Sequence, residues 1–241
     1  MYNISKYRAI IFDVGDTLLR REPSNTEVLR ERLFKAGYSC VDDKLRRAHK
    51  LCEVWIGEQI MKEMNGTPRM SDDEFMNKLD RIAVSTIFDD DILDVDKIVK
   101  DISLIESRKQ EWELVEGVKE VLNELKEKGF ILAIVSNFNT TLLDLLQKHE
   151  LLGYFSEVTV SSLVGLEKPD PKILHITCER IGVSPQDSLY IGDHPFDVLC
   201  AKNAGMDIMW ICDEGDEIPE HLGVEPDYYI NSVASIIDTY L

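Results

Sequence analysis

Residues 7–18 read YRAIIFDVGDTL, an apolar run followed by a turn with two aspartates and a threonine. Residues 7–14 are short, apolar and rich in branched side chains, which indicates a buried strand. No comparable stretch follows between about residues 25 and 107, where the apolar spacing predicts helices over 26–36, 42–64, 71–88 and 94–109. The sequence therefore predicts one strand followed at once by a helical insertion.

After residue 112 short apolar strands alternate with helices. We expect strands over 130–135, 157–160, 188–191, 207–211 and 228–230, and helices over 118–128, 140–149, 170–181, 196–204 and 232–240. Such alternation is typical of a parallel sheet with helices on both faces. The predicted fold is a doubly wound parallel α/β sheet formed by residues 1–20 and 111–241, with an all-helical domain, residues 21–110, inserted after the first strand.

Composition and charge argue against several classes of protein. The 241 residues include 27 Lys and Arg against 45 Asp and Glu, a net charge of −18, whereas a nucleic-acid binder needs a basic face. No apolar stretch approaches the roughly 18 residues that cross a bilayer, and the amino terminus lacks a hydrophobic signal core. Five scattered cysteines suit reduced thiols. We expect a cytoplasmic protein without nucleic-acid or membrane partners.

Polar residues follow the predicted strands, and ligands of open parallel sheets bind at the carboxyl ends of the strands. The first strand runs into the segment 13–17, the second into Ser136 and Asn137, and the fourth into Asp193 and Asp197. Lys168 precedes the helix that follows the third strand. We expect these side chains to meet at one edge of the sheet.

This collection has a chemical logic. The carboxylates of Asp13, Asp193 and Asp197 repel one another unless a cation joins them, and ligands that are all oxygen select a hard ion such as Mg²⁺. Asp13 could attack phosphorus and form an aspartyl phosphate, while Lys168 neutralises the nucleophile and the phosphoryl group. Ser136 and the backbone amides of residues 16, 17 and 137 could hold phosphate oxygens.

Four motifs make the chain resemble the haloacid dehalogenase superfamily. They are FDVGDTL at 12–18, IVSN at 134–137, GLEKPDP at 165–171, and YIGD at 190–193 followed by Asp197 and AKNAG at 201–205. The resemblance covers the whole chain except the helical insertion. It implies a Rossmann-like core, and a helical cap inserted between the first two motifs.

The resemblance also implies roles. Asp13 would be the nucleophile, and Mg²⁺ would be bound by Asp13, the carbonyl of Gly15 and Asp193. Asp197 would either join the ion through water or orient Lys168. The residues that would bind phosphate belong to the first two motifs and are Asp16, Thr17, Ser136 and Asn137. The cap would close over a small phosphorylated molecule and exclude water.

One position departs from the family pattern. The family's phosphatases carry an aspartate two residues after the nucleophile, which protonates the leaving oxygen and then activates water, and here that position is Gly15. A general acid–base contributes about 10²–10⁴ in rate. Three explanations remain open. Asp16 takes over as the acid, the substrate has a good leaving group or supplies its own acid, or the protein binds phosphate with little turnover.

The superfamily includes two other chemistries. Dehalogenases usually lack a Gly-Asp pair in the fourth motif, so Gly192 and Asp193 argue against that activity. Phosphonate hydrolases use a cap lysine as a Schiff base and a small residue at the position of Gly15, with Lys44, Lys50 and Lys62 as candidates here. We expect a phosphatase first, a low-activity or non-catalytic phosphate-binding protein second, and a phosphonate hydrolase third.

Overall fold

The computed structural model describes residues 4–88, 94–213 and 216–240, and the chain divides into two compact units. The first, the sheet unit, comprises Met1–Arg20 and Trp112–Leu241, and the second, the helical unit, comprises Arg21–Glu111. The chain leaves the sheet unit through β2 (Leu19–Glu22) and returns through β3 (Glu111–Leu114), and these strands pair as a two-stranded sheet. Among the described residues, no helix has the length and apolar character needed to cross a membrane.

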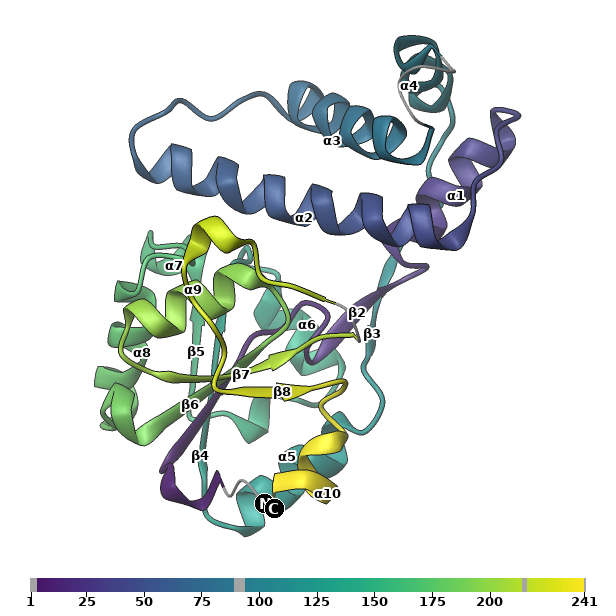
Figure 1. The fold of residues 1–241 in the computed structure, drawn as a ribbon. Coiled ribbons are helices and arrows are strands. Elements are labelled where there is room, and N and C mark those ends of the chain that lie inside the picture. Colours follow the sequence, from purple (N-terminus) through teal and green to yellow (C-terminus); the bar gives the residue numbers. More distant parts are fainter. Residues whose placement is uncertain (1–3, 89–93, 214–215, 241) are drawn as a thin grey trace. The chain divides into compact units, whose positions relative to one another are not determined.

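Six strands of the described residues form one parallel sheet, which confirms the predicted fold class (Figure 1). Their order across the sheet is β5 (Glu157–Val160), β4 (Ile131–Ser136), β1 (Ala9–Phe12), β6 (Ser188–Gly192), β7 (Asp207–Ile211) and β8 (Tyr228–Ile230). All four residues of β1 are fully buried, because this strand is central and both of its faces are covered. The site residues that follow β1, β4 and β6 therefore emerge from three neighbouring strands.

Helices cover both faces of the sheet. On one face, Ile10 and Phe12 of β1 pack in a cluster with apolar residues of α5 (Val118–Glu127), α6 (Leu142–Lys148) and α10 (Ser235–Tyr240). On the other face, Ile11 packs in a cluster with residues of α8 (Lys172–Ile181) and α9 (Pro195–Asn203). The alternation of side chains along β1 thus serves two cores, as a doubly wound sheet requires.

The helical unit consists, in its described residues, of α1 (Asn25–Lys35), α2 (Asp42–Met64), α3 (Asp72–Ile87) and α4 (Val95–Ser103). Ser71 and Glu74 form a capping box at the start of α3. The guanidinium of Arg32 donates two hydrogen bonds to the carboxylate of Asp80, at 2.8 and 2.6 Å. It donates two more to the carbonyl of Ile102. This buried pair joins α1 to α3 and α4 within the unit.

The structure differs from the sequence expectations in a few elements. The helix expected over 94–109 ends at Ser103, because its buried face ends at Ile102 and Leu104 is 77% exposed. The charged strands β2 and β3 and the single-turn helix α7 (Ser161–Val164) were not predicted. The strand expected over 7–14 is confined to Ala9–Phe12, so Asp13 lies directly beyond the end of β1.

Candidate active site

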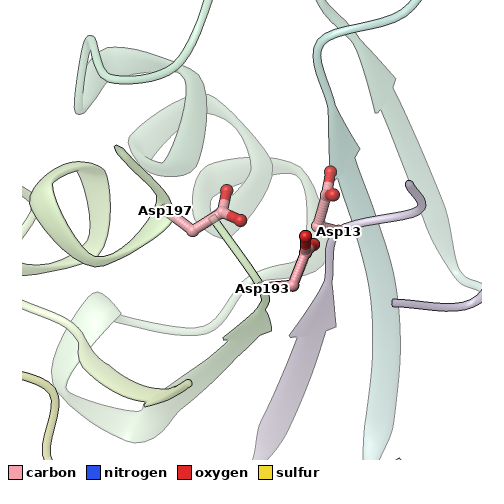
Figure 2. Close-up of side chains that lie close together, drawn as sticks. All are labelled: Asp13, Asp193 and Asp197. Carbon is pink, nitrogen blue, oxygen red and sulfur yellow. The ribbon is translucent and has the colours of Figure 1, made fainter. Parts of the chain in front are cut away.

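Three aspartates gather at the carboxyl edge of the sheet (Figure 2). Asp13 directly follows β1, Asp193 directly follows β6, and Asp197 lies in the first turn of α9. One carboxylate oxygen of each lies within 4.8 Å of the other two. Asp13 and Asp197 are buried, and Asp193 is half-buried. The structure thus brings together three of the residues that the sequence placed at this edge.

The loop after Asp13 is a tight turn built around one carbonyl group. The carbonyl of Val14 accepts hydrogen bonds from the N–H groups of Leu18 and Leu19, both at 2.9 Å. Asp16 is exposed and has a left-handed backbone with φ of 49°, and its N–H donates to the carbonyl of Leu19 at 2.8 Å. The backbone N–H of residue 16, one of the amides expected to hold phosphate, is therefore bonded within the loop.

Thr17 connects this loop to the end of β6. Its hydroxyl donates to Oδ1 of Asp193 at 3.1 Å, and its N–H donates to the carbonyl of Val14 at 3.4 Å. The side chain is fully buried. In this structure Thr17 therefore orients Asp193.

Gly15 occupies the position where the family pattern has its second aspartate. Its backbone lies outside the left-handed region that favours glycine. A Cβ added at this position would have Oδ2 of Asp13, at 4.0 Å, as its nearest heavy atom beyond the adjacent residues, which is an ordinary contact distance. The turn therefore does not require a glycine here. The absence of the family's aspartate removes an acid from the site, and the backbone has room for that side chain.

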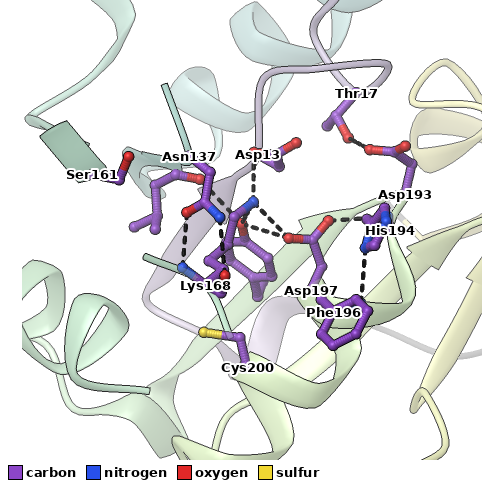
Figure 3. A network of polar contacts seen from close by, with 12 residues as sticks. Asp13, Thr17, Asn137, Ser161, Lys168, Asp193, His194, Phe196, Asp197 and Cys200 are labelled. Carbon is purple, nitrogen blue, oxygen red and sulfur yellow. Dashed lines mark hydrogen bonds and ion pairs between the residues drawn. The ribbon is translucent and has the colours of Figure 1, made fainter. Parts of the chain in front are cut away.

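Lys168 lies at the centre of the polar network (Figure 3). Its ammonium donates to Oδ1 of Asp13 at 2.7 Å, to Oδ1 of Asp197 at 2.6 Å and to the hydroxyl of Tyr190 at 3.0 Å. Only 6% of the residue is exposed. Because an ammonium has three N–H groups, these three contacts match its donors one to one.

Asp197 is held by protein donors on both of its oxygens. Oδ1 accepts from Lys168, and Oδ2 accepts from the N–H of His194 at 3.0 Å in a capping box at the start of α9. A Cβ at Gly192 would lie 2.5 Å from Oδ2, so this close approach requires the glycine. The Gly-Asp motif thus packs Asp197 against the end of β6.

Asn137 ties the end of β4 to the lysine loop. Its side chain donates to the carbonyl of Lys168 at 2.9 Å and accepts from the N–H of Lys168 at 2.8 Å. Ser136, the last residue of β4, is 3% exposed and precedes this link. The side chain of Asn137 therefore has a positioning role that the sequence did not predict.

The pKa values show how strongly the charges interact. Burial raises the pKa of Asp193 well above the usual carboxyl range, and the charges of Asp13 and Asp197 raise it further. Burial also raises the pKa of Asp13, against the opposing charge of Lys168. Burial lowers the pKa of Lys168, but the charges of Asp13 and Asp197 outweigh it, so this pKa lies above its ordinary value. The lysine is thus a permanent cation.

One lysine does not satisfy this group of acids, since the side chain of Asp193 accepts from the neutral hydroxyl of Thr17 and its charged form is disfavoured by burial and by the neighbouring acids. A second cation bound to Asp13 and Asp193 would stabilise the charged form of Asp193. Donor sets made of oxygen alone fit hard ions such as Mg²⁺. The residues present therefore fit a divalent metal ion.

The three lysines considered for a phosphonate hydrolase lie outside the sheet unit. Lys44, Lys50 and Lys62 are on α2 in the helical unit. His194 accepts a hydrogen bond on Nδ1 from the N–H of Phe196 and stacks on that ring, so it caps α9. Tyr190, in contrast, was quoted as part of a motif without a role, yet it contacts Lys168 directly. Its signal was a phenol hydroxyl in the middle of the buried strand SLYIG.

A parallel sheet of this strand order, whose carboxyl edge carries the aspartate, lysine and paired acids described above, is the architecture of a Rossmann-like hydrolase. The family model described as haloacid dehalogenase-like hydrolase matches residues 10–211. The chain belongs to this family, as its four motifs indicated.

Individual relatives agree with this assignment. A phosphoglycolate phosphatase of Vibrio vulnificus (strain CMCP6) is 27% identical over 240 residues, which cover 97% of this chain and 96% of the relative. The HAD-hydrolase YfnB from Bacillus subtilis, whose structure is bound to magnesium, is similar with a TM-score of 0.62 and 22% identity, covering 96% and 97% of the two chains. A predicted phosphoglycolate phosphatase from Haemophilus somnus 129PT gives a TM-score of 0.58 and 21% identity, covering 97% and 98%. At these identities the two structures show a shared fold.

Proposed function

We propose that the protein is a Mg²⁺-dependent phosphatase that hydrolyses a small phosphorylated metabolite through an aspartyl phosphate on Asp13. The observation that carries this proposal is the buried carboxylate of Asp13, held by Lys168 at 2.7 Å beside a second acid, Asp193. The name of the Vibrio vulnificus relative, phosphoglycolate phosphatase, supports a small phosphate monoester as substrate. The buried free thiols of Cys178 and Cys200 support a reducing compartment, the cytoplasm.

We assign the metal ion to Asp13, the carbonyl of Gly15 and Asp193. Mg²⁺ would supply positive charge that polarises the phosphoryl group. The sequence left two roles open for Asp197, metal binding through water or orientation of Lys168. Both of its oxygens accept hydrogen bonds from protein donors, which favours the second role.

In the proposed reaction a carboxylate oxygen of Asp13 attacks phosphorus, and the bond from phosphorus to the leaving oxygen breaks. Lys168 donates to the other carboxylate oxygen, Oδ1, and stabilises its charge during attack. Water then attacks the phosphorus of the aspartyl phosphate, the bond to Asp13 breaks, and phosphate leaves with the carboxylate restored. Ser136 and the backbone N–H of Asn137 would bind phosphate oxygens throughout.

The helical unit would serve as the cap of this enzyme. Residues 21–110 were expected to form it, and Arg21–Glu111 are a compact unit with a core of their own. That core supports an independently packed unit. We propose that it excludes water and contacts the leaving group.

Gly15 favours a second candidate, a phosphate-binding protein with little turnover. With no acid at this position, the leaving oxygen must depart as an anion or take a proton from elsewhere. A phosphonate hydrolase that uses a lysine of the helical unit is the third candidate. Asp13, Lys168 and Asp193 oppose the non-catalytic candidate, because binding alone does not need a nucleophile paired with a lysine.

The test is hydrolysis of p-nitrophenyl phosphate with Mg²⁺ or with a chelator, using the wild type, Asp13→Asn and Asp16→Asn. Asp227→Asn is the matched control, since Asp227 accepts hydrogen bonds from Lys202 and the N–H of Ile208 on the sheet unit away from the site. We expect turnover that requires Mg²⁺, persists in Asp227→Asn and disappears in Asp13→Asn. Turnover that survives in Asp13→Asn would contradict the aspartyl-phosphate mechanism.

Phosphate binding without Asp13-dependent turnover would instead support the second candidate. Borohydride trapping of a lysine adduct with a phosphonate substrate would support the third. Loss of turnover in Asp16→Asn would identify Asp16 as the residue that activates water in place of the missing aspartate, because nitrophenolate departs without a proton.

A further inference from the structure

Tyr190 lies where three functional strand ends meet. It stands on β6 in register with Ile11 of β1, which in turn pairs with Ala133 of β4. All three side chains belong to the core on the face of α8 and α9, and Tyr190 is fully buried. Its hydroxyl reaches across β1 to the carbonyl of Val135 on β4, at 3.1 Å. The ring thus spans the strand that carries the nucleophile.

The hydroxyl of Tyr190 makes three polar contacts. It lies 3.0 Å from Nζ of Lys168, 3.3 Å from Oδ1 of Asp197 and 3.1 Å from the carbonyl of Val135. Since an ammonium only donates, the phenol oxygen accepts from Lys168 and gives its own proton to one of the other two oxygens. Burial raises the pKa of Tyr190, so the group is a neutral phenol.

The contact with Tyr190 occupies the third N–H of Lys168. The other two point at Oδ1 of Asp13 and Oδ1 of Asp197. An ammonium at the end of a four-carbon side chain rotates easily unless each donor has a partner. With all three donors engaged, Lys168 acts on the carboxylate of Asp13 and has no remaining N–H to turn toward a phosphate oxygen.

We propose that Tyr190 is a positioning residue: it fixes the ammonium of Lys168 on Oδ1 of Asp13 and thereby sets the orientation of the nucleophilic carboxylate. The inference rests on the proposed function, because it assigns Asp13 the attack on phosphorus. Oδ2 of Asp13 is the oxygen that faces the Gly15 loop. Fixing Oδ1 through Lys168 keeps Oδ2 directed to that side.

The test compares Tyr190→Phe with Tyr228→Phe. Tyr228 is the matched control, because it is also buried in the sheet unit and its hydroxyl is hydrogen-bonded, to that of Tyr7 at 3.0 Å, away from the site. For each variant we would measure kcat and KM for p-nitrophenyl phosphate, the inhibition constant of inorganic phosphate, and the melting temperature. Asp13→Asn gives the background rate.

A hydrogen bond to a charged group is worth about 10- to 100-fold in an equilibrium or rate, so Tyr190→Phe should lower kcat by about 10- to 100-fold. KM and the inhibition constant of phosphate should stay within about twofold, because Tyr190 is fully buried and offers no surface to a substrate. Tyr228→Phe should lower the melting temperature about as much as Tyr190→Phe does, and it should leave kcat unchanged.

Three results would overturn the inference. Equal kcat values in Tyr190→Phe and Tyr228→Phe would reduce Tyr190 to a structural role. A rise in KM and in the inhibition constant at unchanged kcat would mean that Tyr190 or Lys168 binds phosphate directly. Wild-type turnover no higher than that of Asp13→Asn would refute the proposed function itself, and the inference with it.

Discussion

Restoring a carboxylic acid at position 15 should convert this site into a faster phosphatase for alkyl esters. A side chain fits there, because the nearest atom to an added Cβ is Oδ2 of Asp13 at 4.0 Å and the backbone lies outside the left-handed region. A carboxyl oxygen extends about 2.4 Å beyond its Cβ. The acid of Gly15→Asp would therefore reach to about 6 Å from Oδ2 of Asp13, far enough to contact a leaving oxygen that departs in line on the opposite side of phosphorus.

The size of the gain depends on the leaving group. A positioned general acid contributes about 10²–10⁴ in rate when the leaving oxygen is a poor anion, so kcat/KM for 2-phosphoglycolate should rise by at least about 100-fold in Gly15→Asp. The nitrophenolate of p-nitrophenyl phosphate departs readily without a proton, and the gain there should stay below about tenfold. The gain in kcat/KM for 2-phosphoglycolate divided by the gain for p-nitrophenyl phosphate tests whether the new side chain acts as an acid.

The assay is release of inorganic phosphate from both esters at saturating Mg²⁺. Gly15→Asn is the control, because it matches the new side chain in size but has no acidic proton to give. Equal gains on both esters, or an equal gain in Gly15→Asn, would refute the reasoning from the leaving group. So would a wild type that already cleaves both esters equally well and loses this property in Asp16→Asn.

Three further predictions concern the support of the site and the helical unit. Gly192→Ala places a methyl group 2.5 Å from Oδ2 of Asp197, so urea unfolding should show a loss of about 1–3 kcal/mol and kcat should fall; an unchanged kcat would contradict the role given to Asp197. Arg32→Met leaves Asp80 buried without its bidentate partner and should cost about 3–5 kcal/mol in the same measurement, with a loss under about 1 kcal/mol as the contrary result. Because the folded-state pKa of Asp193 is raised, stability without metal should fall as pH rises above the unfolded carboxyl value near about 4, and Mg²⁺ should offset this loss. The rise in melting temperature with Mg²⁺ should therefore be larger at pH 7 than at pH 5 and absent in Asp193→Asn, and a rise that persists in that variant would place the ion elsewhere.

The arrangement of the sheet was predictable because its strands carry local signals. A short and mostly apolar run such as residues 188–191 has few alternatives to a buried strand, and Gly205, with φ of 69°, follows the helix before β7. The strands β2 and β3 had no such signal, since LRRE and EWEL are charged and only four residues long. Their pairing depends on where the chain leaves the sheet unit for the helical insertion and where it returns. Periodicity does not encode these points.

The site was predictable as a set of residues and much less so as a network. Strand ends and motifs pointed to Asp13, Lys168 and Asp193, because parallel strands deliver their carboxyl ends to one edge. The assignment of individual donors depended on geometry. The backbone N–H of Asp16 donates a hydrogen bond within its own loop, and the side chain of Asn137 forms hydrogen bonds with the main chain of Lys168.

The central position of β1 has a consequence for how the chain is made. β1 is synthesised first, yet its neighbours β4 and β6 begin only at Ile131 and Ser188, beyond the whole helical unit. At 5–20 residues per second, the ribosome needs on the order of 10 s to reach β4, and during this time the apolar segment Ala9–Phe12 has neither of its partner strands. Exposed strand edges of this kind invite aggregation, and pairings distant in sequence form slowly. The helical unit, whose contacts are local, is thus complete on the nascent chain before the sheet that carries the nucleophile, and chaperone binding is expected at the first strand during that interval.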